Sequence, residues 1–487
     1  FTDQFSVSLN LRAYKSEWNS AGYLPARLNL PKTAWVDDGS GEGNGGERSR
    51  FDGRLWANYL LNDESQFTFY AFGTDLDNTR WQTSYPGDAW RIGRPAPGNF
   101  SGGTEQTNTR KAYGGGLAYN YKGEWADKAA NLTIGLEYLN ENEKRDQYRL
   151  PWGTGRTRGT HYTETDYILK TTSLFAESSY QILEPLQVRL GGRYDRLTGE
   201  LDTGPNQTGA LGANRHYDAK TRGFFSPKAG LLLTPLDWLD VYTNFGRGYG
   251  LPGLNNGDFF AQERFELTVR DQVELGYRLR PTDWLDLEMI YFHIWTDKDQ
   301  TYDPLAPLGQ EMQNAGSTRR KGLETLVSLH PFDFWTLSAN HTWQIAEYKK
   351  NANSQFLLDG YKMTGVPDSI TNLELAYAPD YGLGGRLNFR YEAGELLRNN
   401  PAVTRLGAAN TDPYRYYEAP DKTSLDLQLS YKFDDSYKLT VDVMNVLNRE
   451  NYGSVGAPSV SNLGITDYTY SIQPPLTVYV SLGINWN

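Results

Sequence analysis

The sequence contains no cysteine and no long apolar run, and only 5 of its 487 residues are histidines. Without cysteine the chain forms no disulfide bond, which permits an oxidising compartment without requiring one. The absence of any stretch of about 18 consecutive apolar residues excludes a membrane-spanning helix. The net charge of −11 argues against nucleic acid as a partner.

In place of apolar runs, the chain shows a strict alternation of apolar and polar residues. The alternation runs through residues 5–14 (FSVSLNLRAY), returns along the chain, and is present again in residues 476–484 (LTVYVSLGI). A period of two gives a β-strand one apolar face and one polar face. When it recurs in many strands of about 10 or more residues, it indicates a closed barrel with lipid outside and water or protein inside.

The composition agrees with such a barrel. The chain has 13 Trp and 34 Tyr, and its mean hydropathy is −0.64. A transmembrane barrel is polar on average, because half of every strand faces the lumen and the long loops face water. The many aromatic residues suit the belts that such barrels carry at the two lipid interfaces.

Two kinds of connection alternate along the chain. Short connections rich in Pro, Asp, Asn and Gly, the residues of tight turns, are expected near residues 62–65, 125–127, 184–185, 235–237, 281–283, 331–333, 379–382 and 434–435. Long polar connections are expected at residues 15–47, 82–109, 151–165, 202–218, 251–267, 297–309, 345–358, 395–421 and 452–467. This asymmetry is typical of outer-membrane barrels, which have short periplasmic turns and long extracellular loops.

Counting the alternating segments gives about 18 strands, an even number, as is usual for an outer-membrane barrel. In residues 424–431, for example, Leu427 and Leu429 are expected on lipid, with Asp426 and Gln428 in the lumen. The predicted fold is therefore all-β, a transmembrane antiparallel β-barrel. The alternative, a soluble propeller or several sandwiches, would need shorter strands and no asymmetry between connections.

Several motifs resemble one family of such barrels. Residues 225–231 (FSPKAGL), with 241–249 (VYTNFGRGY) and 251–252 (LP), resemble the central barrel signature of TonB-dependent outer-membrane receptors. The opening segment, which contains Trp18 and Tyr23, is similar to an outer loop that in many of these receptors follows the fourth barrel strand. Further similar motifs follow in the family order: 273–278 (VELGYR), 314–316 (NAG) with 321–324 (KGLE), 365–367 (GVP) and 443–448 (VMNVLN).

The chain also departs from this family. Such receptors have a barrel of about 22 strands around an N-terminal plug, whereas the sequence shows about 18 strands and neither a plug nor a TonB-contact segment. We therefore expect residues 1–487 to form the barrel domain of a receptor, with the plug and the first strands preceding Phe1. At the other end, Trp486 resembles the aromatic terminus that serves as a barrel-assembly signal.

The resemblance implies active import across the outer membrane of a Gram-negative bacterium. The expected ligand is scarce and too large for porins, such as a ferric siderophore or another metal chelate, and no cofactor is expected. The expected partners are outer-membrane lipid, lipopolysaccharide and an inner-membrane TonB complex that acts through the plug. The alternative is a passive porin-like channel of about 18 strands, with an inward-folded constriction loop and rings of opposed lumen charges.

An enzyme is not expected, because the chain lacks the necessary residues. A barrel hydrolase would need a nucleophile beside a poised base. The histidines are far apart and none has metal-ligand spacing to another, and no glycine-rich phosphate loop precedes a helix. The five histidines are His161, His216, His293, His330 and His341.

The first candidate site is an acidic, glycine-rich stretch at residues 37–47 (DDGSGEGNGGE). Its carboxylates, Asp37, Asp38, Glu42 and Glu47, could bind a hard cation through oxygen ligands. The spacing matches no known calcium loop, and a solvated acidic loop is the alternative.

The other candidate sites mix arginine with aromatic residues. Such mixtures suit anionic or aromatic ligands, through bidentate hydrogen bonds and cation–π contacts. Loops that face lipopolysaccharide and interface belts use the same residue types, so both interpretations stay open. The candidates are Trp18 and Tyr23; Arg80, Trp81, Trp90 and Arg91; Tyr148, Arg149 and Trp152, with Arg156 and Arg158 nearby; and Tyr414, Arg415 and Tyr416.

Overall fold

The computed structural model describes most of the chain, and the described part consists of strands, turns and connecting segments. Within it, no helix is long and apolar enough to cross a membrane. The described residues are 4–19, 24–25, 45–82, 103–151, 156–206, 213–250, 267–302, 312–351, 360, 362–363, 365–396, 419–460 and 466–485.

The strands differ greatly in length, from two residues to 23. Their bounds are β1 (Phe5–Asn19), β2 (Leu24–Pro25), β3 (Gly45–Asn62), β4 (Ser65–Gln82), β5 (Thr104–Trp125), β6 (Lys128–Arg149), β7 (His161–Leu183), β8 (Leu186–Thr203), β9 (His216–Leu236), β10 (Leu239–Gly250), β11 (Thr268–Thr282), β12 (Leu285–Tyr302), β13 (Met312–Leu329), β14 (Trp335–Asn351), β15 (Ser369–Tyr377), β16 (Gly382–Glu392), β17 (Lys422–Lys432), β18 (Tyr437–Met444), β19 (Tyr452–Val460), β20 (Thr466–Ile472) and β21 (Thr477–Ile484).

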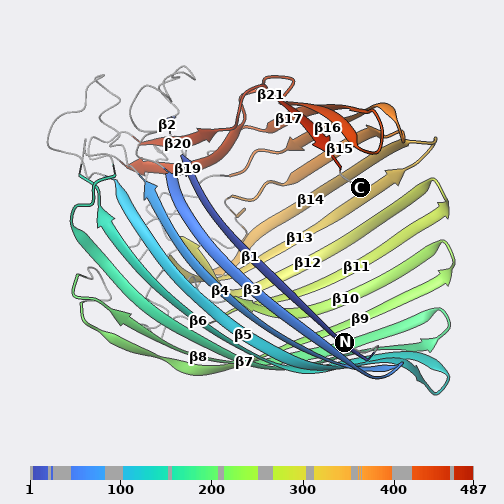
Figure 1. Ribbon diagram of the computed structural model, residues 1–487, viewed down its shortest axis with the longest axis horizontal. Helices are drawn as coiled ribbons and strands as arrows, with labels where there is room; N and C mark the ends of the chain where they lie inside the picture. Colours follow the sequence, from blue (N-terminus) through green and yellow to red (C-terminus); the bar gives the residue numbers. More distant parts are fainter. Residues whose placement is uncertain are drawn as a thin grey trace.

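Eighteen of these strands form one antiparallel sheet. Pairing follows chain order from β1 and β3 through β18 to β21, and Figure 1 shows the sheet curving round on itself with tilted strands. In the described registers, β1 pairs with β3 alone and β21 with β18 alone, so they are the two edges of the sheet. β2, β19 and β20 form a separate three-stranded sheet. The predicted all-β, antiparallel barrel with about 18 strands is confirmed.

All eight predicted short turns lie between consecutive paired strands. The β5–β6 turn illustrates their geometry, because Ala126 and Asp127 have φ values of 51° and 58°. Two consecutive left-handed residues make the tight hairpin turn whose twist matches that of the flanking strands. The short turns gather at one end of the tilted strands (Figure 1).

The predicted long connections include residues that belong to strands, because several strands extend well into them. β5 begins at Thr104 rather than after residue 109, β7 at His161 rather than after residue 165, and β14 continues to Asn351. These extensions carry polar residues on both faces, so the alternation that marks a strand in lipid disappears there. The expected loop at 452–467 holds β19 and the first residues of β20.

The outward face of the wall carries a continuous apolar belt. On β1, Leu9 and Leu11 are 63% and 61% exposed, as expected of side chains that lie in lipid. On β6 the outward row is apolar through Tyr138 and continues as Asn140 and Asn142, so the belt ends there. On β1 and β3–β8 the belt includes Leu9, Leu11, Phe51, Phe67, Phe69, Tyr113, Leu117, Ile134, Leu136, Tyr138, Leu174, Leu190 and Tyr194.

Four strongly buried apolar side chains of β7 and β8 lie on the opposite, lumen face. Tyr167 and Leu169 of β7 and Leu197 and Leu201 of β8 are each less than 5% exposed. They occupy the positions that alternate with outward-facing Leu174 and its row, as the two-residue period requires. The wall therefore places apolar residues outside and a small apolar cluster inside one part of a largely polar lumen.

Candidate functional site

The predicted arginine and aromatic candidates are only partly within the described residues. Trp18, Arg80, Trp81, Tyr148 and Arg149 are described, each close to the end of a strand. Tyr23, Trp90, Arg91, Trp152, Tyr414, Arg415 and Tyr416 lie outside the described residues.

The predicted acidic metal site is likewise only partly within the described residues. Glu47 is described, in β3 opposite Thr79 and Glu17. Its predicted partners Asp37, Asp38 and Glu42 lie outside the described residues, so this site stays a prediction.

The two-residue period sorts neighbouring candidates onto opposite faces of the wall. Trp81 belongs to the same row of β4 as the outward-facing Phe67 and Phe69, whereas Arg80 belongs to the lumen row. Tyr148 likewise belongs to the outward row of β6 and Arg149 to the lumen row. The sequence groups these residues in pairs, and the structure separates each pair.

Arg149 and Trp18 lie on the lumen face, and each takes part in a contact between an arginine and an aromatic ring. The Arg149 guanidinium lies 5.2 Å from the centroid of the Tyr162 ring, and the Arg48 guanidinium lies 5.8 Å from that of Trp18. These are cation–π distances. Burial raises the pKa of Tyr162. Both contacts lie on the lumen face, at the end of the strands opposite the short turns.

The segment at residues 156–160, here named the strap, lies on the outward face above the apolar belt. Arg156 stacks on the Trp81 ring at 4.0 Å and donates hydrogen bonds to Glu17 and Asn19 of β1, over 3.3 and 3.0 Å. Because Trp81, Glu17 and Asn19 all belong to outward rows, the strap crosses the outside of the wall from β6 to β1. It therefore ties the first strand to the β6–β7 connection.

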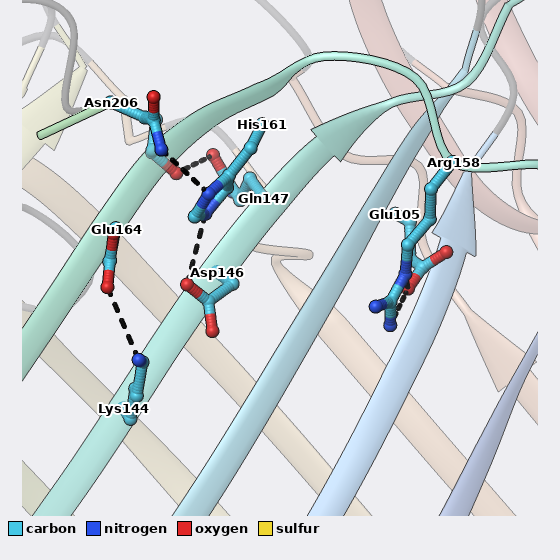
Figure 2. Close-up of polar contacts among 9 residues, drawn as sticks. Glu105, Lys144, Asp146, Gln147, Arg158, His161, Glu164 and Asn206 are labelled. Carbon is cyan, nitrogen blue, oxygen red and sulfur yellow. Dashed lines mark hydrogen bonds and ion pairs between the residues drawn. The ribbon is translucent and has the colours of Figure 1, made fainter. Parts of the chain in front are cut away.

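The second arginine of the strap, Arg158, also combines an aromatic contact with a carboxylate partner, on the neighbouring strands. Arg158 donates to Glu105 over 2.6 Å and lies 4.5 Å from the centroid of the Tyr148 ring, while Trp81 Nε1 donates to Glu105 over 3.1 Å. Figure 2 shows Arg158 reaching across to Glu105. The Glu105 carboxylate is almost fully buried, and its hydrogen bond to Arg158 raises the pKa of the guanidinium. These arginines are thus already paired, which argues against their serving as a free anion site.

Sequence reasoning missed one cluster on the same outward face. Asp146, His161 and Glu164 place one ligand atom each within 4.8 Å of one another. The histidines have no metal-ligand spacing to one another, and the two carboxylates lie on different strands, β6 and β7. The pairing of β6 with β7 is the signal that could have found them.

The lumen face carries a network of charged and hydroxyl side chains between β4 and β8. Arg193 contacts Glu137, donates to Asp195 over 2.8 Å and donates to Ser173 over 2.7 Å. Tyr70 from β4 donates to the same Glu137 carboxylate. The network links β4, β6, β7 and β8 along the lumen face, so it stiffens this part of the wall and keeps it hydrophilic.

The opposite part of the lumen face is a polar recess of about 850 Å³ along β15–β18 and β21. Lys422 donates to Glu392 over 2.7 Å, and Arg390 pairs with the same carboxylate at 3.2 Å. Asn388 and Asp426 line it as well. Mixed charge at this density suits contact with a hydrated solute or with a polar protein surface.

The described residues offer no arrangement for nucleophilic catalysis. Ser328 lies 3.1 Å from His330 Nε2, but the other ring nitrogen contacts the Thr336 hydroxyl at 3.2 Å instead of a carboxylate. This exposed group at a short turn lacks the acid that orients the base in a catalytic triad.

Comparison with known proteins identifies the family of this wall. The chain matches the family described as TonB dependent receptor-like, beta-barrel over residues 3–446. Similar solved structures include the unliganded ferric citrate transporter FecA, with 14% identity over 99% of this chain and 68% of that chain and a TM-score of 0.76. The siderophore receptor PiuA from Acinetobacter baumannii has 13% identity, covers 99% and 72% of the two chains, and has a TM-score of 0.76.

A third similar structure is the ferric yersiniabactin uptake receptor FyuA from Yersinia pestis. It has 15% identity, covers 100% of this chain and 69% of that chain, and has a TM-score of 0.74. At such low identity, the structural likeness concerns the fold alone. Because the family match itself spans most of the sequence, the chain belongs to the TonB-dependent receptors and forms a β-barrel of that family.

Proposed function

We propose that this barrel imports a scarce chelate, such as a ferric siderophore, across the outer membrane with energy from a TonB complex. The observation that carries the proposal is the family match over residues 3–446. The similar structures named above include receptors whose names refer to ferric citrate, ferric yersiniabactin and siderophores. The alternative of a porin-like channel has no comparable support.

The lumen chemistry supports the same proposal. An apolar belt outside and ion pairs such as Arg193 with Asp195 inside define a hydrophilic path through a lipid-embedded wall. At the rim, lumen-facing Arg80, Arg149 and Trp18 offer the cations and aromatic surface that an anionic chelate needs. Outward-facing Trp81 and Tyr148 contact the strap instead, so we assign them to the lipopolysaccharide side.

The test is uptake of radioactive iron in the native host under iron limitation, supplied in turn as citrate, catecholate and hydroxamate chelates. Deletion of the gene should abolish uptake of one chelate class, and deletion of TonB should abolish the same uptake. Uptake that survives loss of TonB, together with diffusion of small sugars through vesicles that contain the purified protein, would instead support a porin.

Matched substitutions in the native full-length protein then test whether the lumen-facing candidates bind the ligand and the outward-facing candidates do not. Arg80→Ala and Arg149→Ala should reduce chelate affinity by roughly tenfold each, about the value of a charge-assisted hydrogen bond. Trp81→Ala and Tyr148→Ala serve as controls from the opposite face and should leave affinity unchanged. Equal losses on the two faces would contradict the assignment.

The prediction that a plug and further strands precede Phe1 has its own test. The intact mass of the polypeptide taken from the outer membrane can be compared with the 55.1 kDa of the given sequence. A mass larger by roughly 20–30 kDa would match a plug and about four further strands. An equal mass would point to a separate plug chain or to passive diffusion.

A further inference from the structure

Three side chains on the outward face bring metal-ligating atoms together. One donor atom each from Asp146, His161 and Glu164 lies within 4.8 Å of the others, and His161 Nε2 is 3.0 Å from Asp146 Oδ1. The three side chains are between 18% and 24% exposed, so they are partly shielded but open to solutes. Figure 2 shows His161 joined to Asp146, with Glu164 on the neighbouring strand and joined to Lys144.

The pairing of β6 with β7 produces this arrangement. Asp146 lies directly opposite Glu164, so both side chains belong to the outward face. The register then shifts, with His161 opposite Tyr148 and Tyr162 as the additional residue of a bulge. The bulge turns His161 to the same face as Asp146.

Surrounding groups hold the imidazole in this orientation. The ring stacks on Tyr148 at a centroid distance of 4.5 Å and an interplanar angle of 18°, and His161 Nδ1 lies 3.0 Å from the side-chain amide of Asn206. An amide can present either its nitrogen or its oxygen, so Asn206 Oδ1 can accept a hydrogen bond from Nδ1–H while Nε2 binds a metal ion. Such a second partner is what fixes ligand histidines in metalloproteins.

The local charge also favours a cation. Asp166 lies within electrostatic range of Asp146, Glu164 and Asp202, and Lys144 lies 3.3 Å from Glu164. The Oδ1 atom of Asp166 is buried and has no hydrogen-bond partner within the described part of the chain. Arg158 also interacts with Asp146 but is paired with Glu105, and Asp202 is paired with His216. The carboxylates of this group still outnumber the cationic side chains.

We propose that Asp146, His161 and Glu164 bind a divalent transition-metal ion such as Zn²⁺ on the outer face of the barrel wall. Zinc bonds to nitrogen and oxygen ligands are about 2.0–2.2 Å long, so two neighbouring ligand atoms on a tetrahedral ion lie roughly 3.5 Å apart. His161 Nε2 and Asp146 Oδ1 are already 3.0 Å apart, and binding requires side-chain rotation that draws all three donors, now within 4.8 Å of one another, to this spacing. An imidazole with two carboxylates selects zinc-like ions over Mg²⁺ and Ca²⁺.

The position of the site separates it from the transport route. It lies on the outward rows above the apolar belt, whereas a transported ligand passes through the lumen. Three protein ligands leave a fourth position on zinc open, facing the surroundings of the barrel. The bound ion would join β6 to the bulged start of β7 and would hold the strap next to Tyr148.

The test is zinc titration of the untagged, chelator-treated full chain in detergent, followed by calorimetry. We expect one tight site, with affinity at least about tenfold lower in His161→Ala and in Asp146→Asn. Calcium should bind far more weakly than zinc. Unchanged affinity in both variants, or equal affinity for calcium and zinc, would overturn the proposal.

A neighbouring histidine provides the matched control. His216 also lies between two carboxylates, but Asp202 contacts its Nδ1 and Asp218 its Nε2, so the two carboxylates lie on opposite edges of the ring. His216→Ala should therefore keep the zinc affinity, and an equal loss there would contradict the assignment. X-ray absorption of the zinc-loaded wild-type protein, which needs no variant to fold, should show one imidazole among oxygen ligands.

Discussion

The barrel wall has one part built of long strands and another built of short strands, and the two parts differ in what they carry above the membrane. β3–β9 are 18 to 23 residues long, whereas β15–β18 and β21 have 8 to 11 residues. About 9 to 11 tilted residues suffice to cross a bilayer, so the short strands do little more than span it. The long strands continue above the apolar belt and carry the strap and the group formed by Asp146, His161 and Glu164.

The difference shows that the environment, rather than the strand, sets the chemistry of the outward row. On short β16 the row is apolar from Leu383 through Leu387 and Phe389. On long β6 the same row begins with Ile134 and Leu136 and continues as polar residues after Tyr138. Below that level the outward positions meet lipid, and above it they meet head groups and water.

The largest expected effect is on the free energy of unfolding, when arginine is introduced on β6 either within the apolar belt or above it. Leu136→Arg places a charge within the apolar belt and should lower the free energy of unfolding in lipid vesicles by about 2–4 kcal/mol. Asn142→Arg, three outward positions higher, should cost only about 0–1 kcal/mol. Urea unfolding followed by tryptophan fluorescence measures both, and similar losses would show that the belt does not end at Tyr138.

The next contrast compares ion pairs in the two parts of the lumen. Arg193→Ala leaves the buried Asp195 carboxylate without its cation and should cost about 3 kcal/mol, the lower end for breaking a buried pair. Arg386 lies 3.6 Å from Glu374 in the short-strand part, and the two side chains are 53% and 30% exposed, far more than Asp195 at 3%. Arg386→Ala should cost less than about 1 kcal/mol. The same unfolding assay decides, and a reversed order would contradict the argument.

A smaller effect tests how glycine makes room in the lumen. A Cβ atom at Gly276 would lie 2.3 Å from the ring of Tyr242, whose hydroxyl donates to Glu288 over 2.9 Å. Gly276→Ala should therefore cost about 2 kcal/mol through overpacking. Gly246→Ala is the control, because nothing lies within 4 Å of its Cβ position. Equal stability of the two variants in urea unfolding would show that the Tyr242 ring moves freely.

The smallest expected effect is a pH dependence at the upper ends of β8 and β9. The hydrogen bond from His216 to Asp202 raises the pKa of the imidazole above its ordinary value of 6.5, with a further contribution from Asp218. The stabilisation by protonated His216 is complete below that ordinary value and is lost as the pH rises through the raised pKa.

The measurement compares the wild-type protein with His216→Ala. The difference in unfolding free energy should be larger at about pH 6 than at about pH 9. A titration of the histidine signals by nuclear magnetic resonance reports the pKa directly. A difference that grows at high pH would mean that His216 is stabilised in its neutral form.

Much of the fold could be predicted because its signals are local. The turn at residues 125–127 and the alternation in 424–431 each reveal their structure within about 10 neighbouring residues. Upper strand ends such as residues 104–109 of β5 could not be predicted, since every residue there is polar and the alternation between the two faces disappears. The candidate residues were found by type, but Trp81 was grouped with Arg80, which lies on the other face.

The sequence by itself determined the two-residue alternation, the apolar belt and the short turns, because each depends on neighbours in the chain. Only the tertiary structure decided which side chains meet. Arg156 and Glu17 are 139 positions apart, and Asp146 and His161 are 15 apart on two strands whose register shifts between them. The physical reason is that inter-strand register arises from the whole curved sheet, and a shift of one residue moves a side chain to the other face.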